Sequence, residues 1–318
     1  MPGVKGRVAD AFEARVREHE EGWLSPLAVR SYETRGRARD EAEDRLRTPF
    51  QRDRDRILHS KAFRRLKGKT QVFIDPAGDH FRTRMTHTLE TTAIARGVAR
   101  ALQLNEDLTE AVGLGHDMGH TPFGHVGEEE LDACLRERFE LGFRHNEQSL
   151  RIAEGLNLTW EVRDGILKHT GDVEPETLEG KIVRIVDRVA YINHDIDDAI
   201  RHEILSVDDL PRDEVTLLGP SGSKRINTLV HDLVESSAAA GDIVQSEDVA
   251  SAMLSLRGFM FERVYLGPHT SEERTRARET VRRIFEQLAD RGDSPAEIVD
   301  YLSGMTDRFA ITYASELE

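Results

Sequence analysis

Residues 113–125, GLGHDMGHTPFGH, contain three histidines and one aspartate among four glycines. Imidazole and carboxylate groups bind divalent metal ions and transfer protons near neutral pH, so a segment of this composition can carry hydrolytic chemistry. The glycines permit sharp bends of the backbone, and such bends can turn neighbouring side chains toward one point. The spacing of the four side chains decides which chemistry is possible.

His116 and His120 are four residues apart, and on a helix both would lie on one face beside Asp117. This spacing is similar to the His-Glu-x-x-His motif of zinc peptidases. Aspartate is one methylene shorter than the glutamate that acts as the base there, and Gly115 and Gly119 disfavour a long regular helix. We therefore favour a second interpretation, in which His116 and Asp117 are neighbouring ligands of one metal ion at a helix end.

Two further residues complete a candidate metal site. His87 lies in the first turn of a predicted helix, and Asp187 lies within the apolar segment 182–192, where a carboxylate is costly to bury unless it is paired or binds a metal ion. Two histidines and two carboxylates suit Mn²⁺ or Mg²⁺, and also Fe, Ni, Zn or Co ions. Four protein ligands leave positions on the ion for water or substrate oxygens. The predicted ligands are His87, His116, Asp117 and Asp187.

The elements that must position these residues are predicted to be helices. Apolar residues recur at the helical period through most of the chain and strand-like alternation is scarce, which predicts an all-α fold. We expect helices at about 53–67, 86–102 and 181–200, a helix that begins at an Asn105 cap, and several more after residue 225. The helix at 86–102 has an apolar stripe formed by Leu89, Ile94, Val98 and Leu102.

Turn-rich segments divide the chain. Residues 74–84, IDPAGDHFRTR, predict a loop or short hairpin, and residues 219–223, GPSGS, predict a connection. The latter is not a phosphate-binding loop, because that motif needs four residues between its first Gly and Gly-Lys-Ser/Thr, after a strand. We expect an N-terminal helical arm at 1–50, a catalytic core at 51–218 and a C-terminal helical region at 224–318.

Composition limits the environment and the partners of the protein. A 318-residue chain with 38% hydrophobic residues can bury a substantial core, and its net charge of -15 opposes non-specific binding to nucleic acid or an anionic membrane. The run from Arg45 to Lys69 is nevertheless basic, with ten Lys or Arg against two Asp, so an anionic ligand could be met there. The single cysteine, Cys134, rules out a disulfide framework, and neither a signal segment nor an apolar run of membrane-spanning length is present. We expect a cytoplasmic protein that does not cross a membrane.

The order His87, His116-Asp117, Asp187 resembles that of the HD superfamily of metal-dependent phosphohydrolases. A closer resemblance, over roughly residues 30–265, is to the deoxyguanosinetriphosphate triphosphohydrolase family. It is carried by SKAFRRLKGKTQVF at 60–73, RTRMTHTLETTAIAR at 82–96, GHDMGHTPFGHVGEEEL at 115–131, RHNEQSLRI at 144–152, GILKHTG at 165–171 and IVDRVAYINHDIDD at 185–198. This resemblance implies a helical HD core with additional C-terminal helices. It also implies hydrolysis of a deoxynucleoside triphosphate to deoxynucleoside and inorganic triphosphate.

The resemblance further implies three catalytic residues. His120 matches a histidine that acts near the α-phosphorus and the leaving 5′ oxygen, Glu128 matches a carboxylate that orients a histidine, and His145 matches the second histidine of that relay. A histidine paired with a carboxylate is a suitable acid for a sugar alkoxide, which leaves poorly unless it is protonated. The sequence leaves the division of acid and base roles between His120 and His145 open.

The residues expected to bind substrate also follow from the resemblance. Phosphate contacts are implied for Arg84, His125 and Arg188, and sugar contacts for Tyr191 and Asp195. Tyr191 would pack against C2′ and disfavour a 2′ hydroxyl, while Asp195 would accept a hydrogen bond from the 3′ hydroxyl. Either Lys67 or Lys69 is a further candidate for phosphate. The chain resembles the shorter family members, in which preference for guanine is not assured, so base specificity is open.

Two other functions are compatible with the same motifs. Another HD phosphohydrolase, acting on a nucleoside monophosphate or a cyclic nucleotide, would release orthophosphate or a monophosphate. A catalytically silent nucleotide sensor or nucleic-acid-binding protein would keep the fold and the basic run, but the acidic total and the presence of His120, Glu128 and His145 favour an enzyme. Members of the family are often oligomeric, so we expect a homo-oligomer.

Overall fold

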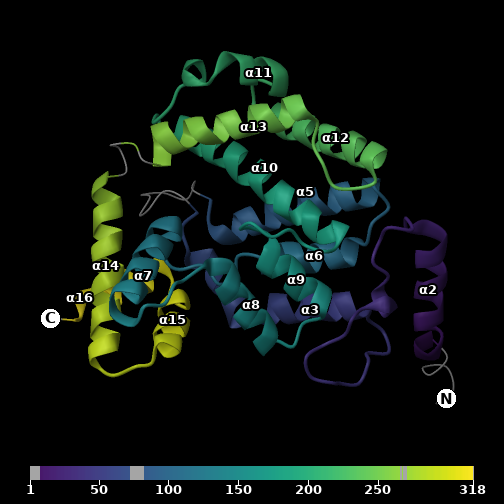
Figure 1. Ribbon diagram of the computed structural model, residues 1–318, viewed down its shortest axis with the longest axis horizontal. Coiled ribbons are helices and arrows are strands. Elements are labelled where there is room, and N and C mark those ends of the chain that lie inside the picture. The colour runs from purple at the N-terminus through teal and green to yellow at the C-terminus, as the bar shows by residue number, and fades with distance from the viewer. Residues whose placement is uncertain (1–7, 72–81, 266, 268–270, 318) are drawn as a thin grey trace.

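The protein is built from helices (Figure 1). The computed structural model describes residues 8–71, 82–265, 267 and 271–317. Within these ranges it contains no strand, only two isolated bridges, Arg37 with Thr159 and Thr70 with Thr83. The α-helices are α2 (Phe12–Trp23), α3 (Pro49–His59), α4 (Lys61–Arg65), α5 (Arg84–Ala101), α6 (Glu106–Gly115), α7 (Gly124–Phe139), α8 (His145–Gly155), α9 (Trp160–Lys168), α10 (Leu178–Arg201), α11 (Arg212–Leu218), α12 (Gly222–Ala240), α13 (Glu247–Met260), α14 (Ser271–Asp290), α15 (Pro295–Ser303) and α16 (Asp307–Ser315). The predicted all-α fold is confirmed.

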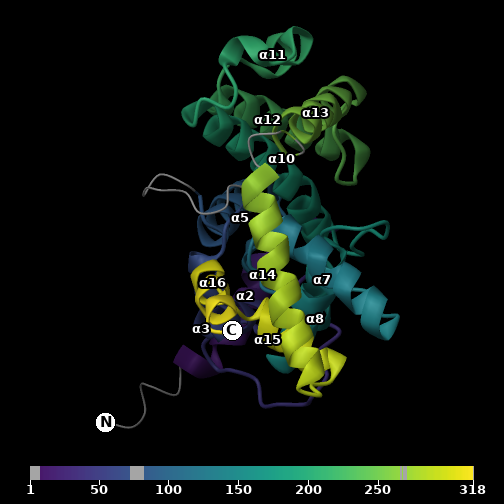
Figure 2. The same cartoon turned by 90° about the vertical axis from the view of Figure 1, so that its left-hand side faces the viewer.

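The centre of the molecule is a bundle in which α5 packs against α6 and α10, and α6 also packs against α3 and α9 (Figure 1). Its core is apolar and fully buried, with Ile57, Leu108, Ile166 and Val186 among its members. Helices α11 to α13 cover one end of α10, and α14 to α16 stand beside α7, as the view turned by 90° shows (Figure 2). The predicted metal ligands belong to the central elements.

The helix expected at about 53–67 is interrupted, so that prediction is wrong in its extent. Helix α3 ends at His59, Ser60 is extended with ψ 153°, and α4 begins at Lys61. The Ser60 hydroxyl accepts a hydrogen bond from the Phe63 amide at 3.0 Å, and thus caps α4 instead of continuing α3. The break turns Lys61 and Arg65 away from the line of α3.

The other helix predictions hold with small changes. Asn105 caps α6 through a 3.2 Å hydrogen bond from the Leu108 amide, and α10 covers the predicted 181–200. Helix α5 begins at Arg84, and its buried face is made mainly of His87, threonines and alanines. The stripe expected on it is wrong at Leu89, whose side chain is 49% exposed.

The segment expected to be a loop or short hairpin, residues 74–84, lies mostly outside the described residues. Its last three residues are described, and they include the bridge partner Thr83 and the start of α5 at Arg84. The connection predicted at 219–223 is confirmed in part, because α11 ends at Leu218 and α12 already begins at Gly222. Gly219 has φ 116°, a conformation that side-chain-bearing residues rarely adopt.

Two further apolar clusters lie outside the central core. One joins α10 and α11 to α12 and α13, with Ile196, Leu218, Leu229 and Met253 among its members. The other joins α7 to α14, α15 and α16. The domain limits that we expected stay a prediction, and the first of these clusters spans the expected limit at 218–224.

The N-terminal half of the basic run is largely neutralised by acids. Arg47, Arg52, Arg54 and Arg56 each form an ion pair with a nearby Asp or Glu. Asp53, completely buried, pairs with Arg37 and accepts two hydrogen bonds from Thr159, so it fixes the segment before α3 to the start of α9. The charge that remains unpaired lies on α4 and after it.

No helix in the described part of the chain is long and apolar enough to cross a membrane.

Candidate metal and catalytic site

The backbone of residues 113–125 departs from a helix at its histidines. Helix α6 ends at Gly115, and residues 116–119 form turns in which the His120 amide donates to the Asp117 carbonyl at 3.1 Å. A Cβ atom on Gly119 would lie 2.5 Å from the His145 carbonyl oxygen, so only glycine allows α8 to approach this closely. His116 and His120 therefore do not share a helical face, which argues against the peptidase arrangement.

The residues predicted to bind a metal ion converge at the end of α6. His87 Nε2, from α5, lies 2.9 Å from Asp187 Oδ1, from α10. His116 Nε2 lies 3.6 Å from Asp117 Oδ1 and 3.6 Å from Asp187 Oδ1. Ligand atoms of His87, His116 and Asp117 all lie within 4.8 Å of one another. Four side chains from two helices and one turn thus surround a single point.

The hydrogen bonding of His116 fits a metal ligand. Its Nδ1 donates to the Gly113 carbonyl at 2.6 Å, which leaves the lone pair on Nε2, and this buried Nε2 has no hydrogen-bond partner. Burial lowers the pKa of His116, but the carboxylates of Asp117 and Asp187 outweigh this effect and raise the pKa to about 9. Surroundings that attract a proton to this nitrogen also attract a metal cation, so the residues present fit a divalent ion.

The two carboxylates of the group are held in their charged form. Burial alone would raise the pKa of Asp117, but His116 and then Arg84 outweigh it and hold the pKa well below its usual range. The pKa of Asp187 is likewise well below its usual range, because the nearby rings of His116 and His87 outweigh its burial. Ionised carboxylates are the form that binds metal ions.

A second group, beside the first, contains the three residues expected to be catalytic. Both carboxylate oxygens of Glu128, on α7, accept from His145 Nδ1 at 2.8 and 2.9 Å, and Glu128 Oε1 also accepts from the His145 amide at 2.9 Å. The His120 ring stacks on the His145 ring with centroids 4.0 Å apart. His120 Nε2 lies 3.9 Å from Asp117 Oδ1 and 4.0 Å from Glu128 Oε2. We call His87, His116, Asp117 and Asp187 the metal-type group. His120 therefore lies between this group and the Glu128–His145 pair.

His120 is buried and uncharged in this arrangement. Burial, followed by the positive charge of Arg84, lowers the pKa of His120 well below its ordinary value. Its Nδ1 is buried without a hydrogen-bond partner. His120 thus has a ring nitrogen available for a ligand.

A residue that the sequence interpretation missed, His169, completes the second group. His169 Nδ1 donates to the Ile166 carbonyl at 2.7 Å, and His169 Nε2 lies 3.2 Å from His145 Nε2. One of these two Nε2 atoms must carry a proton for the contact to be favourable. Burial lowers the pKa of His169 to about 3. Glu128 and His169 thus contact the two ring nitrogens of His145 from opposite sides of the ring.

Arg84 contacts the metal-type group and has further hydrogen-bond donors without a partner. Its Nη1 donates to Asp117 Oδ2 at 2.8 Å, whereas its Nε and Nη2 are buried without a partner. Buried donors without an acceptor are costly, and a guanidinium edge fits phosphate oxygens. His125, expected on the phosphate side, is instead 70% exposed at the rim, with Nδ1 3.4 Å from Glu128 Oε2.

The two residues expected at the sugar lie along α10 and are held from α13 and the π-helical turn after it, Phe261–Tyr265. The Tyr191 hydroxyl accepts from Arg257 Nε at 2.7 Å, and Asp195 Oδ2 accepts a hydrogen bond from the Tyr265 hydroxyl. Burial raises the pKa of Asp195 to about 7. Arg257 and Tyr265 were not foreseen from the sequence.

Arg188, Lys67 and Lys69 are the remaining residues that were considered for phosphate contact. Arg188 lines a cavity of about 200 Å³ between α10 and α13, together with Lys181 and Arg184, and no histidine lines that cavity. Lys69 is buried, and its ammonium donates to the carbonyls of His120 and Ser303 at 2.5 and 2.6 Å. Lys67, the other candidate for phosphate, is exposed.

The comparisons with known proteins agree with this geometry. Residues 84–192 match the family model described as HD domain, and residues 243–316 match the model described as phosphohydrolase-associated domain. The chain is therefore an HD-domain phosphohydrolase.

The particular family follows from the curated relatives. A deoxyguanosinetriphosphate triphosphohydrolase-like protein of Caldanaerobacter subterraneus subsp. tengcongensis is 51% identical, over 92% of this chain and 92% of its own. Relatives with the same name from Clostridium perfringens strain SM101 and Desulfatibacillum aliphaticivorans are 44% and 43% identical, over 93% and 96% of this chain and 95% and 96% of their own. The chain belongs to the deoxyguanosinetriphosphate triphosphohydrolase-like family. A solved structure titled as a hypothetical protein from Aquifex aeolicus superposes with a TM-score of 0.48 at 20% identity, over 82% of this chain and 67% of that chain.

Proposed function

We propose that the protein hydrolyses deoxynucleoside triphosphates to deoxynucleoside and inorganic triphosphate with the help of a divalent metal ion. One observation carries this proposal. The metal-type group and the Glu128–His145 pair lie on either side of His120, and buried Arg84 presents two unpaired donors beside them. A site with a metal, a proton-transferring histidine and a phosphate-binding arginine suits cleavage of a phosphate ester.

In this proposal the ion is held by His87, His116, Asp117 and Asp187, and Mn²⁺ or Mg²⁺ is the first choice. A bound divalent ion polarises the phosphoryl group and lowers the pKa of a bound water. The pairing of Asp117 with Arg84 positions the arginine, so that its free edge binds phosphate oxygens and neutralises their charge.

The residues of the second group serve the proton transfer. The oxygen of water bonds to the α-phosphorus, the bond from the α-phosphorus to the 5′ oxygen breaks, and the 5′ oxygen leaves with a proton. His120 has the ring nitrogen without a partner, so we place it beside the leaving oxygen. Both nitrogens of His145 are already engaged, one by Glu128 and one by His169, so we assign His145 the role of positioning the His120 ring on which it stacks.

Product analysis tests this function. The purified protein is incubated with each of the four dNTPs and with Mn²⁺ or Mg²⁺, the phosphate products are followed by ³¹P NMR, and the deoxynucleoside is quantified by chromatography with ultraviolet detection. We expect inorganic triphosphate and deoxynucleoside in equal amounts from at least one dNTP. Release of only orthophosphate or pyrophosphate would refute the proposal and favour another HD phosphohydrolase.

A matched pair of variants separates catalysis from sensing. A His116→Ala, Asp117→Ala double variant should lose both the bound metal and the activity, whereas His202→Ala, outside the proposed machinery, should keep both. A wild-type protein that binds dNTPs but releases no product under any of these conditions would favour the sensor. We also propose a homo-oligomer that acts in the cytoplasm, which light scattering and cell fractionation test.

A further inference from the structure

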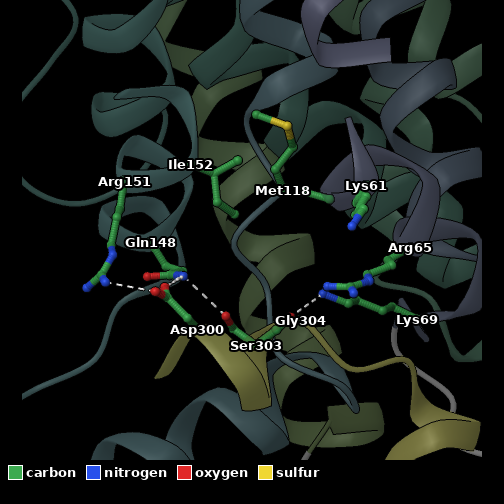
Figure 3. A pocket seen from close by; sticks show the side chains of 11 residues that line it. Lys61, Arg65, Lys69, Met118, Gln148, Arg151, Ile152, Asp300, Ser303 and Gly304 are labelled. Atoms are coloured by element: carbon green, nitrogen blue, oxygen red, sulfur yellow. Dashed lines mark hydrogen bonds and ion pairs between the residues drawn. The ribbon is translucent and has the colours of Figure 1, made fainter. Parts of the chain in front are cut away.

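A polar pocket of about 340 Å³ lies beside the 116–120 turn, which contributes Met118 to its lining (Figure 3). It is bounded by α4, α8 and α15, which come from three distant parts of the sequence. Of the residues considered above for the metal, for catalysis or for substrate, only Lys69, one of two candidates for phosphate, lines it. Its lining is Lys61, Ala62, Arg65, Lys69, Met118, Gln148, Arg151, Ile152, Asp300, Ser303 and Gly304.

The charges in this pocket are predominantly positive. Lys61, Arg65, Lys69 and Arg151 contribute four cations against the single carboxylate of Asp300. Asp300 is already engaged, because it accepts from Arg151 at 2.8 Å and from Gln148 at 2.9 Å. Among the described residues, no acid forms an ion pair with Lys61 or Arg65. In Figure 3 both side chains extend from one wall toward the open space.

The floor of the pocket is formed by buried polar side chains that are fixed by hydrogen bonds. Lys69 is 2% exposed, and two of its three ammonium protons are used by the carbonyls of His120 and Ser303. Burial, followed by the nearby Arg84, lowers the pKa of Lys69 to about 7. Gln148, also buried, presents its amide between Asp300 and Ser303.

We propose that this pocket is a second, non-catalytic binding site for a polyphosphate anion. Converging lysine and arginine side chains with few acids are the groups that recognise phosphate oxygens, and the volume suits a chain of two or three phosphates. The apolar side chains of Met118, Ile152 and Ala62 line the same space, so the anion is either inorganic polyphosphate or the phosphate chain of a nucleotide. The proposal does not depend on the reaction at the histidines.

Occupancy of the pocket would reach the catalytic group through one residue. Lys69 is bonded to the backbone of His120, and Met118 lies between Asp117 and His120 in the same turn. An anion would also connect α4 to α15. Among the described residues, the polar contacts that α15 makes across this pocket come from Lys69, Gln148 and Arg151, and none of these three residues lies on α4. The site is therefore placed to regulate the enzyme.

Calorimetric titration of the full-length chain tests the proposal. The probes are inorganic tripolyphosphate and ATP, and a chelator is present so that no phosphate binds through a metal ion. We expect one site per chain and at least about tenfold weaker binding in Lys61→Ala, Arg65→Ala, since charge-assisted hydrogen bonds contribute on this scale. The matched control is Arg64→Ala, Lys224→Ala, which removes two exposed cations that do not line the pocket and should change affinity less than twofold.

Asp300→Asn gives a change of opposite sign. Removing the only carboxylate of the lining should tighten binding by roughly threefold, the scale of one screened charge at close range. Equal affinity for the two probes identifies the phosphate chain alone as the ligand, and a preference for ATP identifies a nucleotide. Binding of neither probe, or equal weakening in both double variants, overturns the proposal.

Discussion

Substitution of Gly119 by alanine tests how tightly the metal-binding turn is fitted to α8. The added Cβ would lie 2.5 Å from the His145 carbonyl oxygen and 2.6 Å from the Gln148 carbonyl carbon, and the Ser149 amide would be closer still. Ordinary van der Waals contact begins at 3.4 Å, so the turn and α8 must separate by about 0.9 Å. These neighbours are backbone atoms of a helix and cannot rotate away as a side chain would.

The expected loss follows from this displacement. Overpacking in a well-packed interior costs about 1–3 kcal/mol, and contact with backbone places Gly119→Ala near 3 kcal/mol. For a chain of this size that loss lowers Tm by roughly 4 to 5 °C. The separation also moves His145 away from His120, and a displacement near 1 Å at a catalytic group lowers kcat/KM by about a hundredfold.

Gly97→Ala is the matched control. Gly97 lies within α5, and a Cβ there would meet nothing within 4 Å, so alanine should stabilise the helix by about 0.5–1 kcal/mol. Thermal and urea unfolding of both variants, followed by dNTP hydrolysis at a temperature where both are folded, gives the two numbers. A Gly119→Ala protein as stable and as active as Gly97→Ala would refute the proposed contact between the turn and α8.

Three further predictions concern charge. Arg84→Lys keeps the cation but loses the two-donor edge, so kcat/KM should fall at least about tenfold with little change in Tm, and an unchanged kcat/KM would remove Arg84 from phosphate binding. Dialysis against a chelator should abolish hydrolysis, and Mn²⁺ or Mg²⁺ should restore it in the wild type but not in His116→Ala. Burial raises the pKa of Glu179 to about 7 from 4.5, so the folded state keeps a proton that the unfolded state releases, and stability falls as pH rises between these values. Glu179→Gln keeps the hydrogen bonds that Oε1 accepts from Val29 and Asn105 and removes this loss of stability, which is on the order of 3 kcal/mol. In urea unfolding, the stability of the variant relative to the wild type should therefore increase between pH 4.5 and pH 7.5. An equal pH dependence of stability in the two proteins would contradict the assignment.

Much of the metal-type group is predictable from the sequence because most of its members stand out from their sequence neighbours. His116 and Asp117 lie among glycines at a helix end, and Asp187 is an acid within an apolar segment. Each signal is a residue whose type conflicts with its surroundings, and burial then requires a partner. The fold class follows equally well from helical periodicity.

The rest depends on how helices pack, which one sequence does not record. His169 ends an ordinary amphipathic helix, and only the packing of α9 against α8 brings it to His145. In the sequence, Ser60 is compatible with the interior of a charged helix. Only the structure shows that its hydroxyl caps α4. Tyr265 lies 70 residues from Asp195, and their hydrogen bond arises because α13 folds back over α10.

A crystal structure with Mn²⁺ and a non-hydrolysable dNTP analogue, recorded at a wavelength where manganese scatters anomalously, tests the central claim most directly. The described residues contain three groups of side chains that could hold an ion, and two of them include His120. We predict an anomalous peak bounded by His87, His116, Asp117 and Asp187, with the α-phosphate between that ion and His120 and with Arg84 on the phosphate oxygens. A peak among His120, His125 and Glu128, or an α-phosphate remote from His120, would contradict the account.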